Sequence, residues 1–395
     1  AATSGRVLAA ELRALGCNLN FAPVLDVASR PENPVVGLRA FGDDPDLVAE
    51  LGVAMLAAMQ SGGVLASAKH FPGHGNTTVD SHHAGASVER SLDELLALEL
   101  VPFQAAFAAG LASVMTAHVR YPSLDDRPAT FSRVILGDLL RGRLGYDGLV
   151  LTDALDMHAL AATPEPDRAR LALEAGADLP LLGHLPGQEA IVDAVAALSF
   201  PESRRRIDRV RASLGFDLPP LETATWASHR AAAAETARAA ITVAHGGESL
   251  PLRLAAGDRL CLVSVKTGNL TPAETVGEGA SALADQVRSR HAATTHVELE
   301  YGADEAAVEA VAAACGQADV VVVATVNAAT DPAQRQLVAR LSAVGRAPHV
   351  LALRSPVDAA HLTVARSVIC SYGRRGVQTE AAVAVLFGEA EAPGR

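Results

Sequence analysis

The sequence predicts an α/β protein in which a (β/α)8 TIM-type barrel, lacking its first one or two βα units, is followed by a smaller α/β sandwich domain. Over the first 215 residues, short and continuously apolar runs alternate with helix-length segments rich in Ala, Leu and Glu. This alternation indicates parallel strands that helices cover on both faces. A polar side chain also follows several of the runs directly, as functional residues do in a barrel.

Five strands are clear in this first domain. They are Leu19–Val24, Val64–Lys69, Ala112–Ala117, Leu149–Thr152 and Asp178–Leu182, with helices expected over 45–61, 91–110, 133–144 and 167–176. The polar residues that follow the first four strands in turn are Asp26, His70, His118 and Asp153. A doubly wound sheet would instead gather such residues at a single switch point.

The number of strands falls short of a closed barrel. One more strand is expected near 190–200, whereas a (β/α)8 barrel needs eight strands over roughly 250 residues. Residues 1–16 read as an amphipathic helix from the middle of a fold, without an initiating Met. We therefore expect the missing units to precede residue 1, so that the absent signal peptide says nothing about location.

The chain is expected to divide into a catalytic barrel domain at 1–215, a linker at 216–235 and a C-terminal α/β sandwich at 236–395. In the sandwich we expect strands Ala240–Ala244, Leu260–Val265, Val320–Thr325, Val350–Arg354 and Ser367–Ser371, and helices over 303–315, 331–343 and 375–387. This part contains neither GxGxxG nor a Walker motif, so nucleotide binding has no support. We expect it to be structural.

The composition is that of a soluble globular protein, with 49% hydrophobic and 20% charged residues. A net charge of −12 argues against nucleic acid as a partner. No run of 18 apolar residues predicts a membrane segment. The four cysteines, Cys17, Cys261, Cys315 and Cys370, form no CxxC pair and are expected to be reduced. That expectation favours the cytoplasm, and the sequence predicts no oligomeric state.

The densest cluster of chemically active residues is the segment 69–85, KHFPGHGNTTVDSHHAG, which follows the second strand directly. Three glycines and a proline make it a loop. Four of its side chains are potential metal ligands: His70, His74, Asp80 and His82. However, an HxxxH pair normally needs a helix, which Pro72, Gly73 and Gly75 prevent. We therefore predict no metal ion and no cofactor, although a metal-dependent hydrolase stays an alternative.

The same segment fits acid/base chemistry better. Asp80 and His82 are two residues apart, so in an extended segment both side chains lie on the same side. The carboxylate can then orient the imidazole and raise its pKa towards the working pH. Glycines at 73, 75 and 85 would serve as hinges that deliver His82 when substrate is bound.

Asp153 is the candidate nucleophile because it ends an apolar strand and would face the barrel mouth. Its alternative role is that of an N-cap for the next helix, and Asp156, one turn further on, would point elsewhere. Three donors, Lys69, His70 and Arg39, could bind a neutral polyol, with Asp26 as an acceptor. The chain has one Trp and four Tyr, which favours a short pocket over a long aromatic cleft.

Five segments, NFAPVLDV, GLRAFG, KHFPGHGNT, VDSH and LTDALDM, closely resemble, in this order, family 3 glycoside hydrolases of the β-N-acetylglucosaminidase, NagZ type. The resemblance covers nearly the whole chain and includes the second α/β domain of two-domain members. It implies retaining hydrolysis of terminal β-linked N-acetylglucosamine from muropeptide or chitin-derived saccharides. A DQEGG-type segment that supplies a sugar-binding Asp in the family is absent here.

The resemblance also implies roles for individual residues. Asp153 would be the nucleophile, and Asp80 with His82 would form the acid/base dyad. The sugar-binding residues would be Lys69, His70, Arg39 and Asp26. Because a neutral base tolerates an anionic acceptor, a phosphorylase that uses the same dyad is an alternative. A sugar-binding barrel without activity is another.

Overall fold

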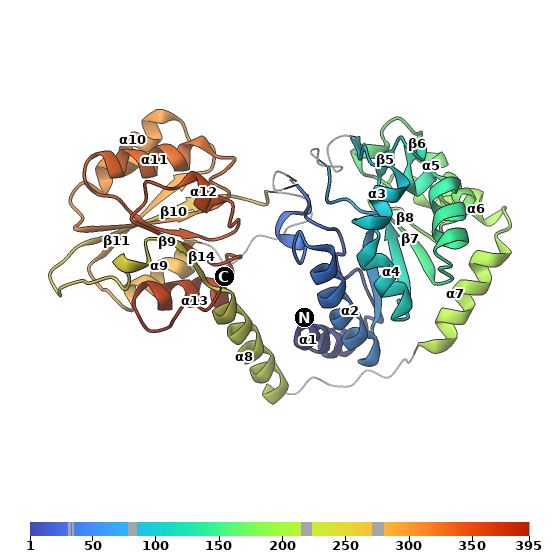
Figure 1. Ribbon diagram of the computed structural model, residues 1–395, viewed down its shortest axis with the longest axis horizontal. Helices are drawn as coiled ribbons and strands as arrows, with labels where there is room; N and C mark the ends of the chain where they lie inside the picture. Colours follow the sequence, from blue (N-terminus) through green and yellow to red (C-terminus); the bar gives the residue numbers. More distant parts are fainter. Residues whose placement is uncertain (31–32, 34, 78–84, 215–222, 271–279, 395) are drawn as a thin grey trace. The chain divides into compact units, whose positions relative to one another are not determined.

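The computed structural model describes residues 1–30, 33, 35–77, 85–214, 223–270 and 280–394. The chain forms two compact units, Ala1–Trp226 and Ala227–Arg395 (Figure 1). The boundary between them falls inside the expected linker, but a helix, α8 (Thr223–Ala240), covers the second half of that range. Among the described residues, no helix combines the length and the apolarity that crossing a bilayer requires.

The first unit is built on a parallel sheet of five strands in the order β1-β2-β4-β7-β8. The strands are β1 (Leu19–Asn20), β2 (Leu65–Phe71), β4 (Ser113–Thr116), β7 (Leu149–Ala154) and β8 (Leu179–Leu181), which confirms all five expected positions. The spatial order follows the chain order without a reversal, which is typical of a barrel and not of a doubly wound sheet. The carboxyl ends of all five strands therefore lie along one edge.

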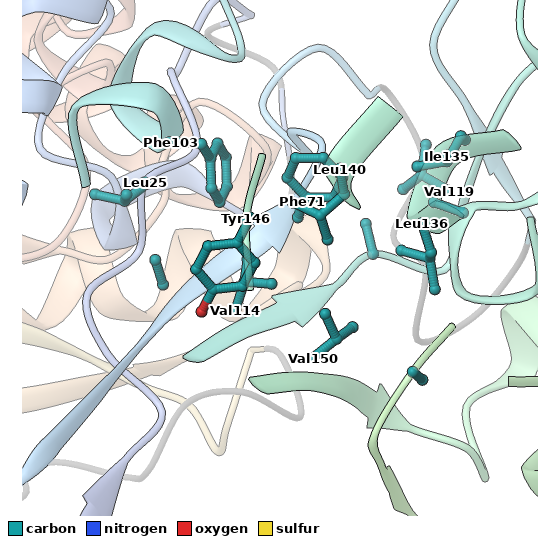
Figure 2. Close-up of a cluster of buried hydrophobic side chains, with 14 of the residues drawn as sticks. Leu25, Phe71, Phe103, Val114, Val119, Ile135, Leu136, Leu140, Tyr146 and Val150 are labelled. Atoms are coloured by element: carbon teal, nitrogen blue, oxygen red, sulfur yellow. The ribbon is translucent and has the colours of Figure 1, made fainter. Parts of the chain in front are cut away.

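Helices cover this sheet and its ends. They are α1 (Ala2–Ala14), α2 (Pro45–Ser61), α3 (Leu92–Ala97), α4 (Val101–Ala108), α5 (Glu165–Ala175), α6 (Gln188–Ala196) and α7 (Pro201–Ser213), with a π-helix at Val134–Arg143 and 3-10 turns at Gly37–Arg39, Ala129–Phe131 and His158–Leu160. A small second sheet joins β3 (Ala86–Ser87), β5 (Val119–Tyr121) and β6 (Asp125–Pro128). The core under the helices is continuous and buries Leu25, Phe71, Phe103, Val114 and Val150 (Figure 2).

Two expectations for this unit were wrong. The strand expected near 190–200 is helix α6, because Ile191 and Val195 are spaced four residues apart and both face the core. The single helix expected over 91–110 is broken into α3 and α4. Pro102 stands in the first turn of α4, where it cannot donate to a preceding turn, so the break falls just before it.

The second unit is a sheet of six strands in the order β11-β10-β12-β13-β14-β9, parallel except for β9. The strands are β9 (Thr242–His245), β10 (Leu260–Lys266), β11 (Thr294–Glu300), β12 (Val320–Thr325), β13 (His349–Ala352) and β14 (Ser367–Cys370). The helices are α9 (Ala280–Arg288), α10 (Glu305–Ala314), α11 (Pro332–Ala343), α12 (Asp358–His361) and α13 (Gly376–Leu386), with a 3-10 turn at Gly247–Ser249. Strand β11 was not expected, because it is an edge strand whose polar residues interrupt the apolar pattern.

Alternate side chains of β10 fill two hydrophobic cores, one on each face of the sheet. Cys261 and Val263 face a core that α10 and α11 complete, whereas Leu260 and Leu262 face a second core beneath α9 and α13. Successive side chains of a strand point to opposite faces, so one apolar run fills both layers. Figure 1 shows the two helix pairs on opposite sides of this sheet.

The expectation that all cysteines are reduced was wrong for one pair. Cys261 on β10 and Cys315 at the end of α10 form a disulfide, while Cys17 and Cys370 are free thiols. The two partners are 54 residues apart in the sequence. Only the packing of α10 against β10 brings them together, and no local spacing signals it.

Candidate active site

The carboxyl edge of the first sheet gathers the candidate residues on adjacent strands. A bridge between Val24 and Lys69 extends the pairing beyond β1, and Asp26 follows it. Lys69 and His70 lie near the end of β2, and Asp153 lies near the end of β7. The edge therefore presents carboxylates, a cation and an imidazole at the carboxyl ends of the strands.

Asp26 is fully buried and accepts three hydrogen bonds. Its Oδ1 accepts the backbone N–H groups of His70, at 3.1 Å, and His74, at 2.6 Å. Its Oδ2 lies 2.6 Å from Nδ1 of His70. Burial by itself would raise the pKa of Asp26, but His70 and His74 outweigh it and lower this pKa to about 2. Asp26 is therefore an anion that fixes the loop after β2.

His70 is held between two carboxylates. Its Nδ1–H donates to Asp26, so the opposite nitrogen, Nε2, faces Oδ2 of Asp153 at 3.8 Å. The side chain is only 4% exposed, which leaves the ring little freedom to turn. The separation from Asp153 is longer than a hydrogen bond. Asp26 thus sets the tautomer and direction of a histidine that points at the candidate nucleophile.

Asp153 is partly exposed, and donors and positive charge surround its carboxylate. Its side chain is 24% exposed, and its Oδ1 accepts the N–H of Ala154 at 2.8 Å. Burial would raise its pKa, but His70, His118, the Ala154 N–H and Lys69 together lower it below the usual value. The carboxylate is therefore ionised near neutral pH, as a nucleophile must be. The nearest short helix, at His158–Leu160, has Met157 at its N-cap position.

Lys69 and Arg39 add positive charge to the same place. Burial is the largest cause that lowers the pKa of Lys69, and the charge of Arg39 lowers it further. The charges of Asp153 and Asp26 act in the opposite direction. Arg39 ends the Gly37–Arg39 turn, and its Nη1 lies 3.5 Å from the carbonyl oxygen of Val35. Five of the seven predicted site residues therefore influence one another.

The predicted dyad, Asp80 and His82, lies outside the described residues, which stop at Thr77 and resume at Gly85. Of the candidate metal ligands, His74 is buried, and its Nδ1 lies 2.9 Å from the hydroxyl of Thr77. Burial and the charge of His70 lower the pKa of His74 to about 4, so its ring is neutral. Within the described ranges, no three His, Cys, Asp or Glu side chains are grouped as a metal site.

Two of the three expected hinge glycines are tightly packed. A Cβ at Gly75 would lie 1.7 Å from the carbonyl oxygen of Val27, and one at Gly73 would lie 2.6 Å from Cβ of Glu99. Gly73 also has a φ of +135°, which L-residues with a side chain rarely adopt. These glycines allow backbone to approach closely at the base of the loop. That the loop moves about these glycines stays a prediction.

His118 belongs to the site, although the sequence reading gave it no role. It follows β4, and its Nε2–H donates to the carbonyl of Ala154 at 2.9 Å, while its Nδ1 lies 2.7 Å from the hydroxyl of Thr130. Burial lowers the pKa of His118. It therefore holds the backbone next to Asp153. Its position after a strand was the signal that could have identified it.

The fold and the site together define an α/β, barrel-like enzyme domain with a carboxylate–histidine site at the carboxyl ends of parallel strands. The chain belongs to glycosyl hydrolase family 3, whose N-terminal domain matches residues 1–212. This result agrees with the resemblance that the sequence motifs carry.

Known relatives and solved structures agree with the family. A beta-hexosaminidase of Chromobacterium violaceum is 43% identical over 212 residues, which are 53% of this chain and 59% of that protein. The chain thus spans about three fifths of the length of this relative. The structure of a glycoside hydrolase family 3 beta-N-acetylglucosaminidase from Paenibacillus sp. str. FPU-7 has 32% identity and a TM-score of 0.90, with 100% of this chain and 78% of that chain covered.

A fungal multi-domain beta-N-acetylglucosaminidase of the same family is also similar. It has 30% identity and a TM-score of 0.89, and the match covers 100% of this chain and 48% of that chain. Both matches cover the whole of this chain and therefore include the first and the second unit.

Proposed function

We propose that this protein removes terminal β-linked N-acetylglucosamine from cell-wall (muropeptide) or chitin-derived saccharides, with retention of configuration. Asp153 is the nucleophile, and the Asp80–His82 pair is the acid/base dyad. The observation that carries the proposal is the ionised, partly exposed carboxylate of Asp153 beside His70, which Asp26 aims at it. Relatives named as hexosaminidases support the choice of sugar.

The reaction proceeds in two balanced steps. In the first, a carboxylate oxygen of Asp153 attacks the anomeric carbon, and the bond to the leaving oxygen breaks as His82 gives that oxygen a proton. In the second, neutral His82 takes a proton from water, which attacks the same carbon and releases Asp153 as a carboxylate. Asp80 stabilises the imidazolium form of His82, which is present before the first step and forms again in the second.

The cationic side chains fit the binding of a neutral sugar. Lys69 and Arg39 supply donors to hydroxyl and amide oxygens, and Asp26 holds the ring of His70, the third predicted sugar-binding residue, in place. Of the four tyrosines, Tyr121 and Tyr146 are buried in the core and cannot form an aromatic platform for a longer chain. This supports a short pocket that binds one terminal sugar.

The proposal extends to the fold and the domains. The five parallel strands are adjacent strands of an eight-stranded (β/α)8 barrel, since they pair in chain order without a switch point. Residues 1–215 carry the catalytic groups. The second unit has no residue of the catalytic motifs and is structural.

The test is turnover of an aryl N-acetyl-β-glucosaminide, with the matching aryl β-glucoside as a control substrate. We expect release of free N-acetylglucosamine, first as the β-anomer by NMR, and a glycosyl adduct on the peptide that contains Asp153. The α-anomer as the first product would overturn the retaining mechanism. Sugar 1-phosphate as the main product in phosphate buffer would make the protein a phosphorylase.

A further inference from the structure

Asn33 has a buried side chain that forms hydrogen bonds to two loops of the candidate site, the loop after β2 and the loop that carries Arg39. No catalytic motif includes it. It is 5% exposed. Its Nδ2 donates to the carbonyl oxygens of His74, at 2.9 Å, and Gly75, at 3.1 Å, and approaches the hydroxyl of Thr77 at 3.2 Å. The amide therefore fixes the backbone that follows β2.

The acceptor side of the same amide holds the other loop. Oδ1 of Asn33 accepts the N–H groups of Val35, at 2.9 Å, and Val36, at 2.7 Å. The turn that these residues begin continues directly to Arg39, whose N–H donates to the carbonyl of Val36 at 2.7 Å. Val35 and Val36 are themselves buried, so this turn is anchored by packing and by a single side chain.

The other end of this connection reaches the carboxylates and the histidine at the carboxyl ends of the strands. The N–H of His74 donates to Asp26, the carboxylate that aims His70 at Asp153. A chain of hydrogen bonds thus leads from Asp26 through His74 to Asn33, and from there to the turn that carries Arg39. The charge of Arg39 in turn acts on Lys69, so the connection ends beside the predicted sugar-binding cations.

We propose that Asn33 is a positioning residue that places Arg39 near Lys69, and so sets the affinity for the sugar. This role rests on the proposed function, in which Arg39 binds the sugar. Neither a smaller side chain nor a carboxylate can replace the amide of Asn33, because this position needs two N–H donors and an acceptor. Asp would keep the acceptor for Val35 and Val36 but lose both donors.

The first measurement is a double-mutant cycle with Asn33→Ala and Arg39→Ala on the aryl N-acetyl-β-glucosaminide. Each single variant should raise KM about tenfold with a smaller change in kcat, because binding made equally in ground and transition states is lost. The double variant should resemble Arg39→Ala alone. Multiplying effects on KM would show that Asn33 does not act through Arg39 and would overturn the proposal.

The second measurement does not need activity. Hydrogen exchange should become faster at 35–39 and at 74–77 in Asn33→Ala, whereas Asn33→Asp should lose protection mainly at 74–77. Asn20→Ala is the matched control, since Asn20 is a half-buried asparagine on β1 whose Nδ2 lies 3.5 Å from Met59 Sδ. Unchanged exchange in Asn33→Ala would overturn the proposal even if no substrate is turned over. Loss of the proposed function alone would leave the exchange result intact.

Discussion

The Nδ1–H of His70 donates to the buried carboxylate of Asp26 across 2.6 Å, and this single bond decides where the imidazole points. The other ring nitrogen then faces Asp153 at 3.8 Å. Because Asp26 also binds two backbone N–H groups, orientation of the ring and folding of the loop after β2 depend on the same anion.

Replacement of Asp153 by Ala should reduce turnover of aryl N-acetyl-β-glucosaminides to background, because no covalent intermediate can form. Steady-state and single-turnover kinetics measure this. Asp156→Asn is the matched control, since its carboxylate accepts the N–H of His184 at 2.7 Å and takes no part in the proposed reaction. Full activity in Asp153→Ala would show that another residue is the nucleophile.

Replacement of His82 by Ala should slow turnover by roughly 10²–10⁴-fold, the usual contribution of a general acid. The loss should shrink for dinitrophenyl leaving groups, which need no proton to depart. A series of aryl substrates with graded leaving groups measures the difference, with His83→Ala as the neighbouring control. Equal losses across the series would argue against His82 as the acid.

Asp26→Asn should destabilise the first unit by about 3–5 kcal/mol, since it leaves buried donors without their anion. The pKa of Asp26 is lowered from 3.8 to about 2, so its stabilising effect is complete above pH 3.8 and is lost as the pH falls towards 2. Urea unfolding of both proteins at several pH values checks this. A difference between them that stays constant from pH 4 to 2 would contradict the assignment.

Gly75→Ala should disturb the site, because the new Cβ would lie 1.7 Å from the carbonyl oxygen of Val27. Backbone must move, and a loss of at least 1–3 kcal/mol in stability is expected together with lower turnover. Gly85→Ala is the control at the other end of the loop, where the nearest atom is 3.9 Å away on Arg120. Thermal unfolding and steady-state kinetics of the two variants should differ clearly. Equal stability and equal turnover would contradict the argument from packing.

The stability of the first unit should fall between pH 6.5 and pH 4 because of His74. Its pKa is lowered from 6.5 to about 4 by burial, so in this range the unfolded chain takes up a proton that the folded chain excludes. The effect amounts to about 3 kcal/mol. Unfolding of His74→Asn should depend less on pH in this window. His184→Asn, a change at a fully exposed histidine, is the control.

Much of the site could be predicted because barrel-like folds place function at strand ends. Asp26, His70 and Asp153 each follow or end an apolar run, and parallel strands bring such positions to one edge. Asn33 carries no such signal. It lies between the first strand and α2, and its importance comes from five contacts to residues that only the folded loops bring near.

The amino-acid sequence by itself determined the parallel strands, their order and the candidate chemistry, because apolar runs, helix periodicity and strand-terminal polar residues are local patterns. Only the tertiary structure decided which residues contact one another. It joined Cys261 to Cys315, packed Gly75 against Val27 and turned His70 towards Asp153. These contacts link positions far apart in the chain, and their geometry depends on how helices and strands pack, which no local pattern encodes.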